Sequence, residues 1–317
     1  MTCTKLIMNT IPIAFAFDEN LIMPAGVCLT SLLENANADT FYDIYILHSS
    51  RISFADTILT RFEDHYSNCK VTFRQVDSFF DSSYEIRGIT SSTYYRLIIP
   101  DMIPEYNKIL YSDVDVIFRD DLSMFYNTDL TGYYLGGVDD CSFLRPDMQK
   151  YINEELGLDY TKGFFYAGNL VINSELMRRD NVVSKLKALS YNKYKHQDLD
   201  IINIVCNGRI KSLSPSFCLT NYMYDLIINR EADMLTVYSK EELYYALDKG
   251  IVHYNGPKPW KEWCQNFDIW WYYYRKTFFS TESYIRQFYD SRIHDIDRMP
   301  LIDRIKLLLK YVRRILQ

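Results

Sequence analysis

The chain has 317 residues, 48% of them hydrophobic, which is enough to bury a large core and excludes a disordered protein. Its formal net charge of -6 argues against a general nucleic-acid-binding protein, so we expect no nucleic-acid partner. The 7 cysteines are scattered without Cys-x-x-Cys pairs, which favours a reducing compartment over a disulfide framework or zinc site. The N-terminal stretch lacks a basic region followed by a long apolar run, so we expect a cytoplasmic protein without an integral membrane segment.

The first half alternates expected strands and helices. The predicted strands are Ile11–Phe17, Asp43–Leu47 and Val71–Val76. The predicted helices run from Pro24 to about Ala36, along the apolar stripe of Phe54, Ile58, Phe62 and Tyr66, and from a cap at Ser92 or Thr93 to Ile99, before Pro100. This order predicts an α/β fold with a mainly parallel, doubly wound sheet flanked by helices, with ligands at the carboxyl ends of the strands.

The stretch Lys108–Phe118 reads as a strand that carries apolar residues up to two carboxylates and then resumes as Val116, Ile117 and Phe118. Because side chains alternate along a strand, Asp113 and Asp115 are expected on one side, with Val114 pointing back into the protein. Unpaired buried carboxylates are costly, and a hard divalent cation is the usual remedy. The alternative is a turn at a strand end with two solvated carboxylates.

The second half is less regular. Tyr134–Val138 is a predicted strand that ends at Asp139 and Asp140. A further strand, Ala167–Asn173, contains Gly168, which indicates close approach to the backbone. A helix is predicted to begin at Gln197, with Asp198 in its first turn, where the helix dipole alone also favours acidic residues.

Four motifs together resemble glycosyltransferase family eight, the retaining nucleotide-sugar transferases that include bacterial lipooligosaccharide galactosyltransferases and glycogenin. The motifs are Ala14–Asn20, Thr93–Leu97, Leu110–Asp115 and His253–Trp260. The resemblance runs from about Pro12 to Trp263 and implies a Rossmann-like, GT-A type fold with a smaller helical C-terminal region. It implies a catalytic domain over 1–265, with the donor site in 12–120 and the sugar and acceptor half in 130–265. Residues 266–317 form the remaining helical, aromatic and basic region.

The resemblance also implies the site residues. Manganese, or alternatively magnesium, would be held by Asp113, Asp115 and His253, and would grip the diphosphate of a UDP-sugar donor. Other family positions match residues that bind the nucleotide, its diphosphate or the donor sugar. The nucleotide and diphosphate set comprises Ala16, Asp18, Asn20, Val114, Gly256 and Lys258, and the catalytic and sugar-binding set comprises Arg96, Asp139 (or its neighbour Asp140) and Asp198. A helix-surface role is the alternative for Arg96, and Gly256-Pro257-Lys258 is one residue shorter than the commoner family form.

Two departures concern the reaction itself. Tyr166 stands where the family commonly has asparagine, and Leu199 stands where many members have a glutamine near the reacting carbon. Because Leu199 cannot be a nucleophile, we expect a front-face displacement that relies on positioning and electrostatics. The alternatives are that a neighbouring residue substitutes for the missing group or that the enzyme is impaired.

The expected function is therefore a retaining, manganese-dependent transferase that moves galactose or glucose from UDP to a bacterial surface glycan or a lipid-linked glycan. The alternatives are a catalytically impaired UDP-sugar-binding protein and, with weaker support, an Asp-x-Asp phosphatase. The segment Leu301–Gln317 combines an apolar face with basic residues, which suggests peripheral contact with the inner face of an anionic membrane. The alternative for this segment is a helix docked on its own domain or on a dimer partner, and the oligomeric state stays open.

Overall fold

The computed structural model describes residues 8–49, 57–86 and 88–315. The chain divides into two compact units, Met1–Asn255 and Gly256–Gln317, which are described separately below.

The first unit is built on a seven-stranded sheet with the strand order β3-β2-β1-β4-β7-β6-β8. Its strands are β1 (Asn9–Ala16), β2 (Thr40–Ser49), β3 (Cys69–Val76), β4 (Ile109–Ser112), β6 (Leu135–Gly137), β7 (Asn169–Ile172) and β8 (Ile210–Ser212). Neighbouring strands are parallel except that β7 runs antiparallel to both β4 and β6. The predicted mainly parallel sheet is confirmed.

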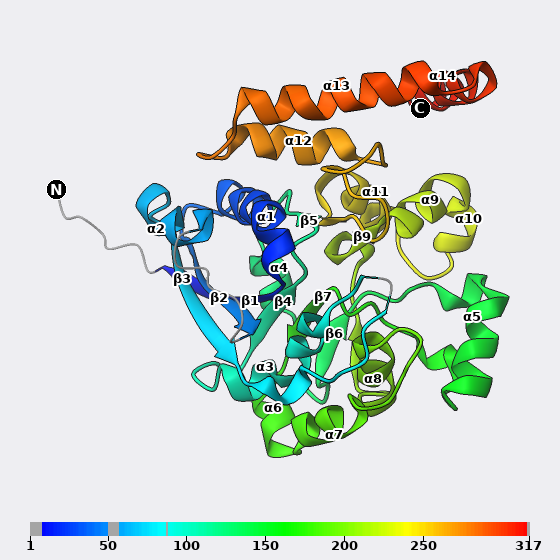
Figure 1. Ribbon diagram of the computed structural model, residues 1–317. Helices are drawn as coiled ribbons and strands as arrows, with labels where there is room; N and C mark the ends of the chain where they lie inside the picture. Colours follow the sequence, from blue (N-terminus) through cyan, green and yellow to red (C-terminus); the bar gives the residue numbers. More distant parts are fainter. Residues whose placement is uncertain (1–7, 50–56, 87, 316–317) are drawn as a thin grey trace. The chain divides into compact units, whose positions relative to one another are not determined.

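Helices cover both faces of this sheet, which explains why its central strands are almost continuously apolar. From Ile11 to Ala16 every residue of β1 is buried. Figure 1 shows α1 (Ile22–Glu34) on one face, and α6 (Ser174–Arg179), α7 (Val182–Leu189) and α8 (Asp198–Val205) on the other. The side chains of these last three helices form one apolar cluster with the sheet.

The remaining helical segments of this unit are short. The α-helices are α2 (Phe62–His65), α3 (Ile99–Met102), α4 (Ser123–Tyr126), α5 (Pro146–Lys150), α9 (Asn221–Asn229), α10 (Glu231–Met234) and α11 (Lys240–Lys249). The 3₁₀ and π segments are η1 (Glu19–Leu21), η2 (Ile58–Arg61), η3 (Ser78–Phe80), η4 (Ser91–Ile98), η5 (Ser142–Leu144), η6 (Tyr151–Glu155), η7 (Tyr160–Lys162) and η8 (Pro215–Phe217).

A second, three-stranded sheet contains β5 (Val116–Ile117), β10 (Val252–His253) and β9 (Leu219–Thr220). The strand predicted to run up to the two carboxylates and to resume at Val116 does resume there, but the resumed part belongs to a different sheet. The large sheet ends at Ser112, the chain bends over the next three residues, and β5 pairs with β10 instead. The two carboxylates therefore lie in the bend between two sheets.

Two helix predictions also need correction. The helix expected to end before Pro100 is a 3₁₀ segment, η4, followed by α3, which holds Pro100 in its first turn. A proline is tolerated there because the first turn has no intrahelical partner for its missing N–H. Of the apolar stripe expected on one helix, Phe54 lies outside the described residues. Ile58 lies on the short segment η2, Phe62 begins α2 directly after it, and Tyr66 follows the end of α2 in an extended conformation.

The second unit contains α12 (Phe267–Lys276), α13 (Glu282–Arg298) and α14 (Leu301–Ile315). Its centre is aromatic: Trp270 and Trp271 are fully buried, and the Trp271 ring packs 4.5 Å from that of Phe288. Trp271 also donates from Nε1 to the Pro259 carbonyl. These aromatic residues therefore form an interior. No described helix in either unit is long and apolar enough to cross a membrane.

Candidate metal and donor site

Asp113, Asp115 and His253 form a compact cluster at the bend between the two sheets. One ligand atom from each residue lies within 4.8 Å of those of the other two. His253 Nε2 is 3.3 Å from Asp115 Oδ1 and 3.7 Å from Asp113 Oδ2. The carboxylates are only 23% and 16% exposed for Asp113 and Asp115 respectively, so a turn with two solvated carboxylates does not describe them.

Backbone hydrogen bonds hold the three residues in place. The N–H of Asp113 donates to the carbonyl of Gly168, and the N–H of Tyr254 donates to the carbonyl of Asp115. In the small sheet His253 lies opposite Val116, directly after the second carboxylate. As predicted, Val114 between the two carboxylates is buried.

Gly168 has no side chain, and the cluster occupies the space that a side chain at this position would fill. A Cβ atom at this position would lie 2.3 Å from His253 Cε1 and 2.8 Å from Asp113 Oδ2, closer than real contacts allow. The close approach predicted from this glycine is confirmed, and the approaching groups are the candidate metal ligands.

The chemistry of the cluster fits a divalent cation. Burial lowers the pKa of His253, but the nearby Asp115 carboxylate more than offsets this, and the pKa lies well above its ordinary value. The imidazole therefore lies in a strongly negative electrostatic potential, which also favours the binding of a metal cation. Cys218 Sγ lies 3.4 Å from His253 Nδ1, so Nε2 is the nitrogen that faces the carboxylates. Two carboxylate oxygens and one imidazole nitrogen suit manganese better than calcium, which prefers oxygen alone.

Arg96 connects this cluster to the start of α8. Its Nη2 donates to Asp113 Oδ1 at 2.8 Å, and its Nε lies 3.1 Å from Asp198 Oδ2. It also donates to the carbonyl of Ala167 and lies over the ring of Tyr111. Burial would lower its pKa, but the two carboxylates raise it above its ordinary value, so the guanidinium stays charged. The helix-surface alternative for Arg96 is wrong.

Asp198 is the first residue of α8 and is 5% exposed. Its Oδ1 accepts a 2.6 Å hydrogen bond from Thr93 Oγ1. Burial raises its pKa, while the positive charge of Arg96 and the Thr93 hydroxyl partly oppose that change. The preceding residue, Gln197, has a φ of 51° and turns the chain into the helix. The expected role of Thr93 as a helix cap is replaced by this contact.

The predicted nucleotide-binding residues of the first unit lie at the end of β1. Ala16 is its last residue, and β1 pairs directly with β4, so the carboxyl ends of both strands meet at one sheet edge. Asp18 accepts from the N–H of Asn20 and from the hydroxyl of Thr90, which precedes η4. Asn20 is exposed. Contact of these residues with a nucleotide stays a prediction.

Asp139 and Asp140 follow β6, and their surroundings differ. Asp139 accepts from the backbone N–H groups of Cys141 and Phe164, and burial raises its pKa to about 6. Asp140 is more deeply buried, with Arg145 Nη1 at 3.6 Å. Burial, with the neighbouring Asp139 charge, raises its pKa to about 7. Which of the two carboxylates contacts a sugar stays a prediction.

Gly256 and Lys258 belong to the second unit. Gly256 has a φ of 136°, a backbone conformation that favours glycine. Their assignment to the diphosphate stays a prediction.

Three contacts around the cluster were missed from the sequence. Tyr111 on β4 donates to Asp113 Oδ1 at 2.7 Å, and the spacing of two residues in the sequence could have revealed this contact. Cys218 reaches His253 from a distant segment that no local pattern marks. Thr93 was predicted as a possible helix cap and as part of a motif, but its contact with Asp198 was not predicted. Of the two departures from the family, Leu199 is partly buried against the core, and the Tyr166 hydroxyl lies 3.5 Å from Thr220 Oγ1.

The chain is similar in sequence to known glycosyltransferases. A family model described as Glycosyl transferase family 8 matches residues 12–264. A Haemophilus influenzae protein named as a glycosyltransferase is 30% identical over 268 residues, which is 82% of this chain and 76% of that protein. A lipopolysaccharide 1,2-glucosyltransferase of Escherichia coli is 22% identical over 81% of this chain and 75% of its own length.

Solved structures show the same fold. The galactosyltransferase LgtC, in complex with donor and acceptor sugar analogues, superimposes with a TM-score of 0.70 and 25% identity, covering 86% of this chain and 99% of that structure. The bifunctional glycosyltransferase WbbM also gives a TM-score of 0.70, at 22% identity. This chain covers 90% of its own length but only 52% of WbbM, so that likeness concerns the fold alone.

Proposed function

The chain belongs to glycosyl transferase family 8, and we propose that it moves a hexose, galactose or glucose, from UDP to a glycan with retention of configuration. The observation that carries the proposal is the connected set of Asp113, Asp115, His253, Arg96 and Asp198. It combines a ligand set for a divalent cation with a buried guanidinium and a second carboxylate. The family assignment leaves the Asp-x-Asp phosphatase alternative without support.

Asp113, Asp115 and His253 would hold manganese, with magnesium as the alternative ion. When bound, the ion supplies positive charge that stabilises the diphosphate as its bond to the sugar breaks. Asp18, Asn20 and the backbone of Ala16 and Val114 would bind the nucleoside. Lys258, with Gly256 beside it, would bind the diphosphate.

Arg96 and Asp198 form the part of the site that orients the donor. Arg96 fixes one oxygen of Asp113, which leaves Asp113 Oδ2 on the side of His253. The same guanidinium and Thr93 fix Asp198, whose carboxylate would hold hydroxyl groups of the donor sugar, together with Asp139. Such preorganised contacts lower the barrier because they need no rearrangement during the reaction.

Retention follows a front-face displacement in this proposal. The leaving phosphate takes the proton of the acceptor hydroxyl while that oxygen attacks the same face of the sugar. Leu199 presents no group able to form a covalent intermediate at this position. The same observation supports the second candidate, a UDP-sugar-binding protein with impaired catalysis.

The acceptor in this proposal is a bacterial surface glycan, such as lipopolysaccharide, or a lipid-linked precursor. The likeness to lipopolysaccharide 1,2-glucosyltransferase supports it. The catalytic domain would span 1–265, and the basic, apolar tail in 266–317 would bring the enzyme to the inner face of the cytoplasmic membrane.

A donor-hydrolysis screen tests the proposal. The full chain with MnCl₂ is incubated with UDP-galactose, UDP-glucose, UDP-N-acetylglucosamine and GDP-mannose, and the released nucleotide is measured. We expect UDP release from one of the two UDP-hexoses, abolished by EDTA. Metal-dependent UDP binding without release from any donor would support the impaired binding protein, and absence of UDP binding would overturn both.

A further inference from the structure

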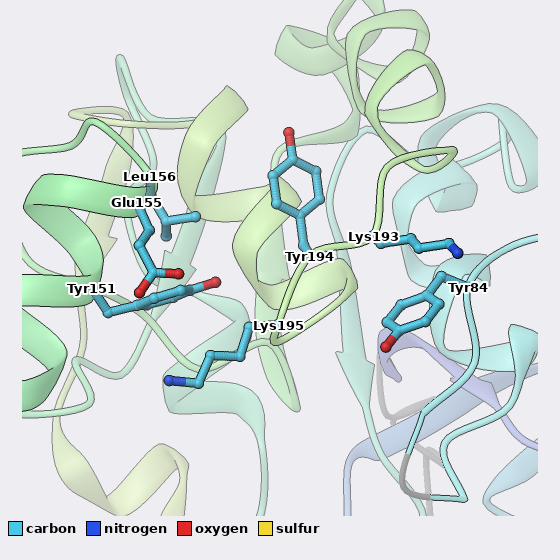
Figure 2. Close-up of a pocket in the computed structure, with 7 residues that line it drawn as sticks. All are labelled: Tyr84, Tyr151, Glu155, Leu156, Lys193, Tyr194 and Lys195. Atoms are coloured by element: carbon cyan, nitrogen blue, oxygen red, sulfur yellow. The ribbon is translucent and has the colours of Figure 1, made fainter.

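A cavity of about 270 Å³ opens beside the start of α8. Figure 2 shows its lining side chains, which come from three segments of the first unit. Tyr151, Glu155 and Leu156 come from η6 and its end, Lys193–Lys195 from the connection between α7 and α8, and Tyr84 from the connection before η4. We call this cavity the tyrosine–lysine pocket. Its volume is close to the lower limit of ligand pockets, about 300 Å³.

Hydrogen bonds fix the walls of this pocket to the proposed donor site. The Tyr84 carbonyl accepts from Gln197 Nε2 and from the Tyr94 hydroxyl, both at 2.8 Å. Gln197 directly precedes Asp198, and Tyr94 directly follows Thr93, which binds Asp198. The Tyr84 wall is thus joined to the two segments that hold the donor-side carboxylate.

The opposite wall is fixed to the same helix. The Tyr151 hydroxyl donates to Asp200 Oδ2 at 2.5 Å, and the His196 N–H donates to the same oxygen at 2.8 Å. Leu199 packs against the apolar cluster that contains Tyr151. The residue that replaces the family glutamine therefore supports the wall of this pocket.

The side chains of the pocket combine aromatic faces with positive charge. Lys195 Nζ lies 4.6 Å from the centre of the Tyr151 ring, and Lys193 Nζ lies 5.8 Å from that of Tyr84. Flat aromatic rings suit the apolar faces of sugars. With two lysines and one glutamate, the pocket carries an excess of positive charge on a chain whose net charge is -6.

We propose that the tyrosine–lysine pocket binds the acceptor, and that this acceptor is a glycan carrying a carboxylate or phosphate group. The tyrosines contact a sugar ring, and Lys193 and Lys195 attract its anionic group, since lysine ammonium groups act as point charges toward such anions. This inference rests on the proposed function, because it specifies the acceptor class for that transfer.

Binding of matched oligosaccharides tests the inference. The probes are a hyaluronan tetrasaccharide with its neutral carboxyl-reduced form, and maltotetraose 6-phosphate with maltotetraose. Dissociation constants are measured by calorimetry on the full chain with MnCl₂ and UDP at low salt. We expect the anionic member of at least one pair to bind about tenfold more tightly, as two exposed ion pairs allow. Preference within the first pair indicates a carboxylate, and within the second a phosphate.

The double variant Lys193→Gln/Lys195→Gln should lose this preference. The matched control Lys240→Gln/Lys249→Gln removes the same charge on α11, which contributes no residue to the lining of the pocket, and should keep the preference. Equal affinity within both pairs, no binding of any probe, or a preference that survives in Lys193→Gln/Lys195→Gln would overturn the inference. UDP release by the wild-type chain is measured separately, because its absence overturns the proposed function while the charge preference is still measured.

Discussion

Arg96 lies between Asp113 and Asp198 and contacts both carboxylates, 2.8 Å from the first and 3.1 Å from the second. One buried guanidinium thus fixes a candidate metal ligand and a candidate sugar-binding group. Since burying an unpaired charge is costly, the two carboxylates keep the buried guanidinium charged, and Arg96 in turn opposes the rise that burial causes in the pKa of Asp198.

The first prediction concerns the cation. Asp113→Ala or Asp115→Ala should abolish manganese-dependent UDP binding and UDP release, because two of the three ligand side chains are carboxylates. Calorimetry with UDP and MnCl₂ measures binding, and circular dichroism checks the fold. The exposed Asp248→Ala on α11 serves as control. Unchanged UDP affinity in the folded variants would contradict the metal role.

The second prediction compares neighbours at the start of α8. Asp198→Ala should lower transfer by about two orders of magnitude or more, as removal of a key electrostatic contact does. Leu199→Ala should lower it only modestly, because an alkyl side chain cannot act as a nucleophile. Both are read from the rate of UDP release at saturating donor. Equal, small losses would mean that this helix start does not face the donor sugar.

The third prediction uses Gly168. Gly168→Ala should weaken manganese-dependent UDP binding by at least about tenfold, since the new Cβ would displace His253 and Asp113 from each other. Gly137→Ala is the matched control, because its Cβ would meet only ordinary contacts at 3.4 Å and beyond. Equal manganese dependence in the two variants would exclude Gly168 from the cluster.

The fourth prediction concerns pH and stability. The pKa of Asp140 is raised to about 7, above its unfolded value near 3.9, so the fold favours its protonated form. This contribution to stability is fully present below about pH 4 and is lost as the pH rises through about 7. Asp140→Asn should therefore raise the free energy of unfolding at pH 8 by about 1 to 3 kcal/mol relative to wild type, and much less at pH 5. Urea unfolding at the two pH values measures it, with the exposed Asp248→Asn as control; equal changes at both pH values would contradict it.

The fifth prediction concerns the C-terminal tail. Leu301, Ile302, Ile305, Leu308 and Leu309 are exposed on α14, and the segment also carries five basic residues. Each basic residue near an anionic surface contributes roughly 1 kcal/mol. Removing Pro300–Gln317 should release the protein from anionic vesicles and leave UDP release intact. Binding should also weaken at high salt. Co-sedimentation measures both, and full-length protein that ignores anionic vesicles would show that the helix has another role.

The sequence predicted the mainly parallel sheet because most of its strands, above all β1 and β2, are apolar runs that alternate with helices, whereas the short edge strand β8 was not predicted. The sequence also predicted that Asp113 and Asp115 lie on the same side of the chain, although for the wrong structural reason. Alternation along a strand was expected, whereas the chain leaves the sheet at Ser112 and bends. That bend depends on β10, which arrives from 136 residues later in the chain (Val116 to Val252) and pairs with β5. No pattern in the sequence around Asp113 indicates that β5 pairs with a strand so far away in the chain.

His253 entered the predicted site only through the resemblance to a family, since one histidine has no spacing that marks it as a ligand. Cys218 was not predicted as part of the site, because its contact with His253 Nδ1 is visible only once β9 and β10 lie side by side. The pocket beside α8 was missed for a similar reason. Its lysines and tyrosines look like ordinary surface residues until three separate segments meet.

The position of β10 between β5 and β9 affects how the protein folds during and after its synthesis. During synthesis the two carboxylates leave the ribosome long before His253, and the strand that carries it must insert between two strands already made. Contacts between residues so far apart in the chain form slowly, because a large loop must close first. The three candidate ligands can therefore meet only after nearly all of the first unit has been synthesised, and no shorter N-terminal piece contains a complete site.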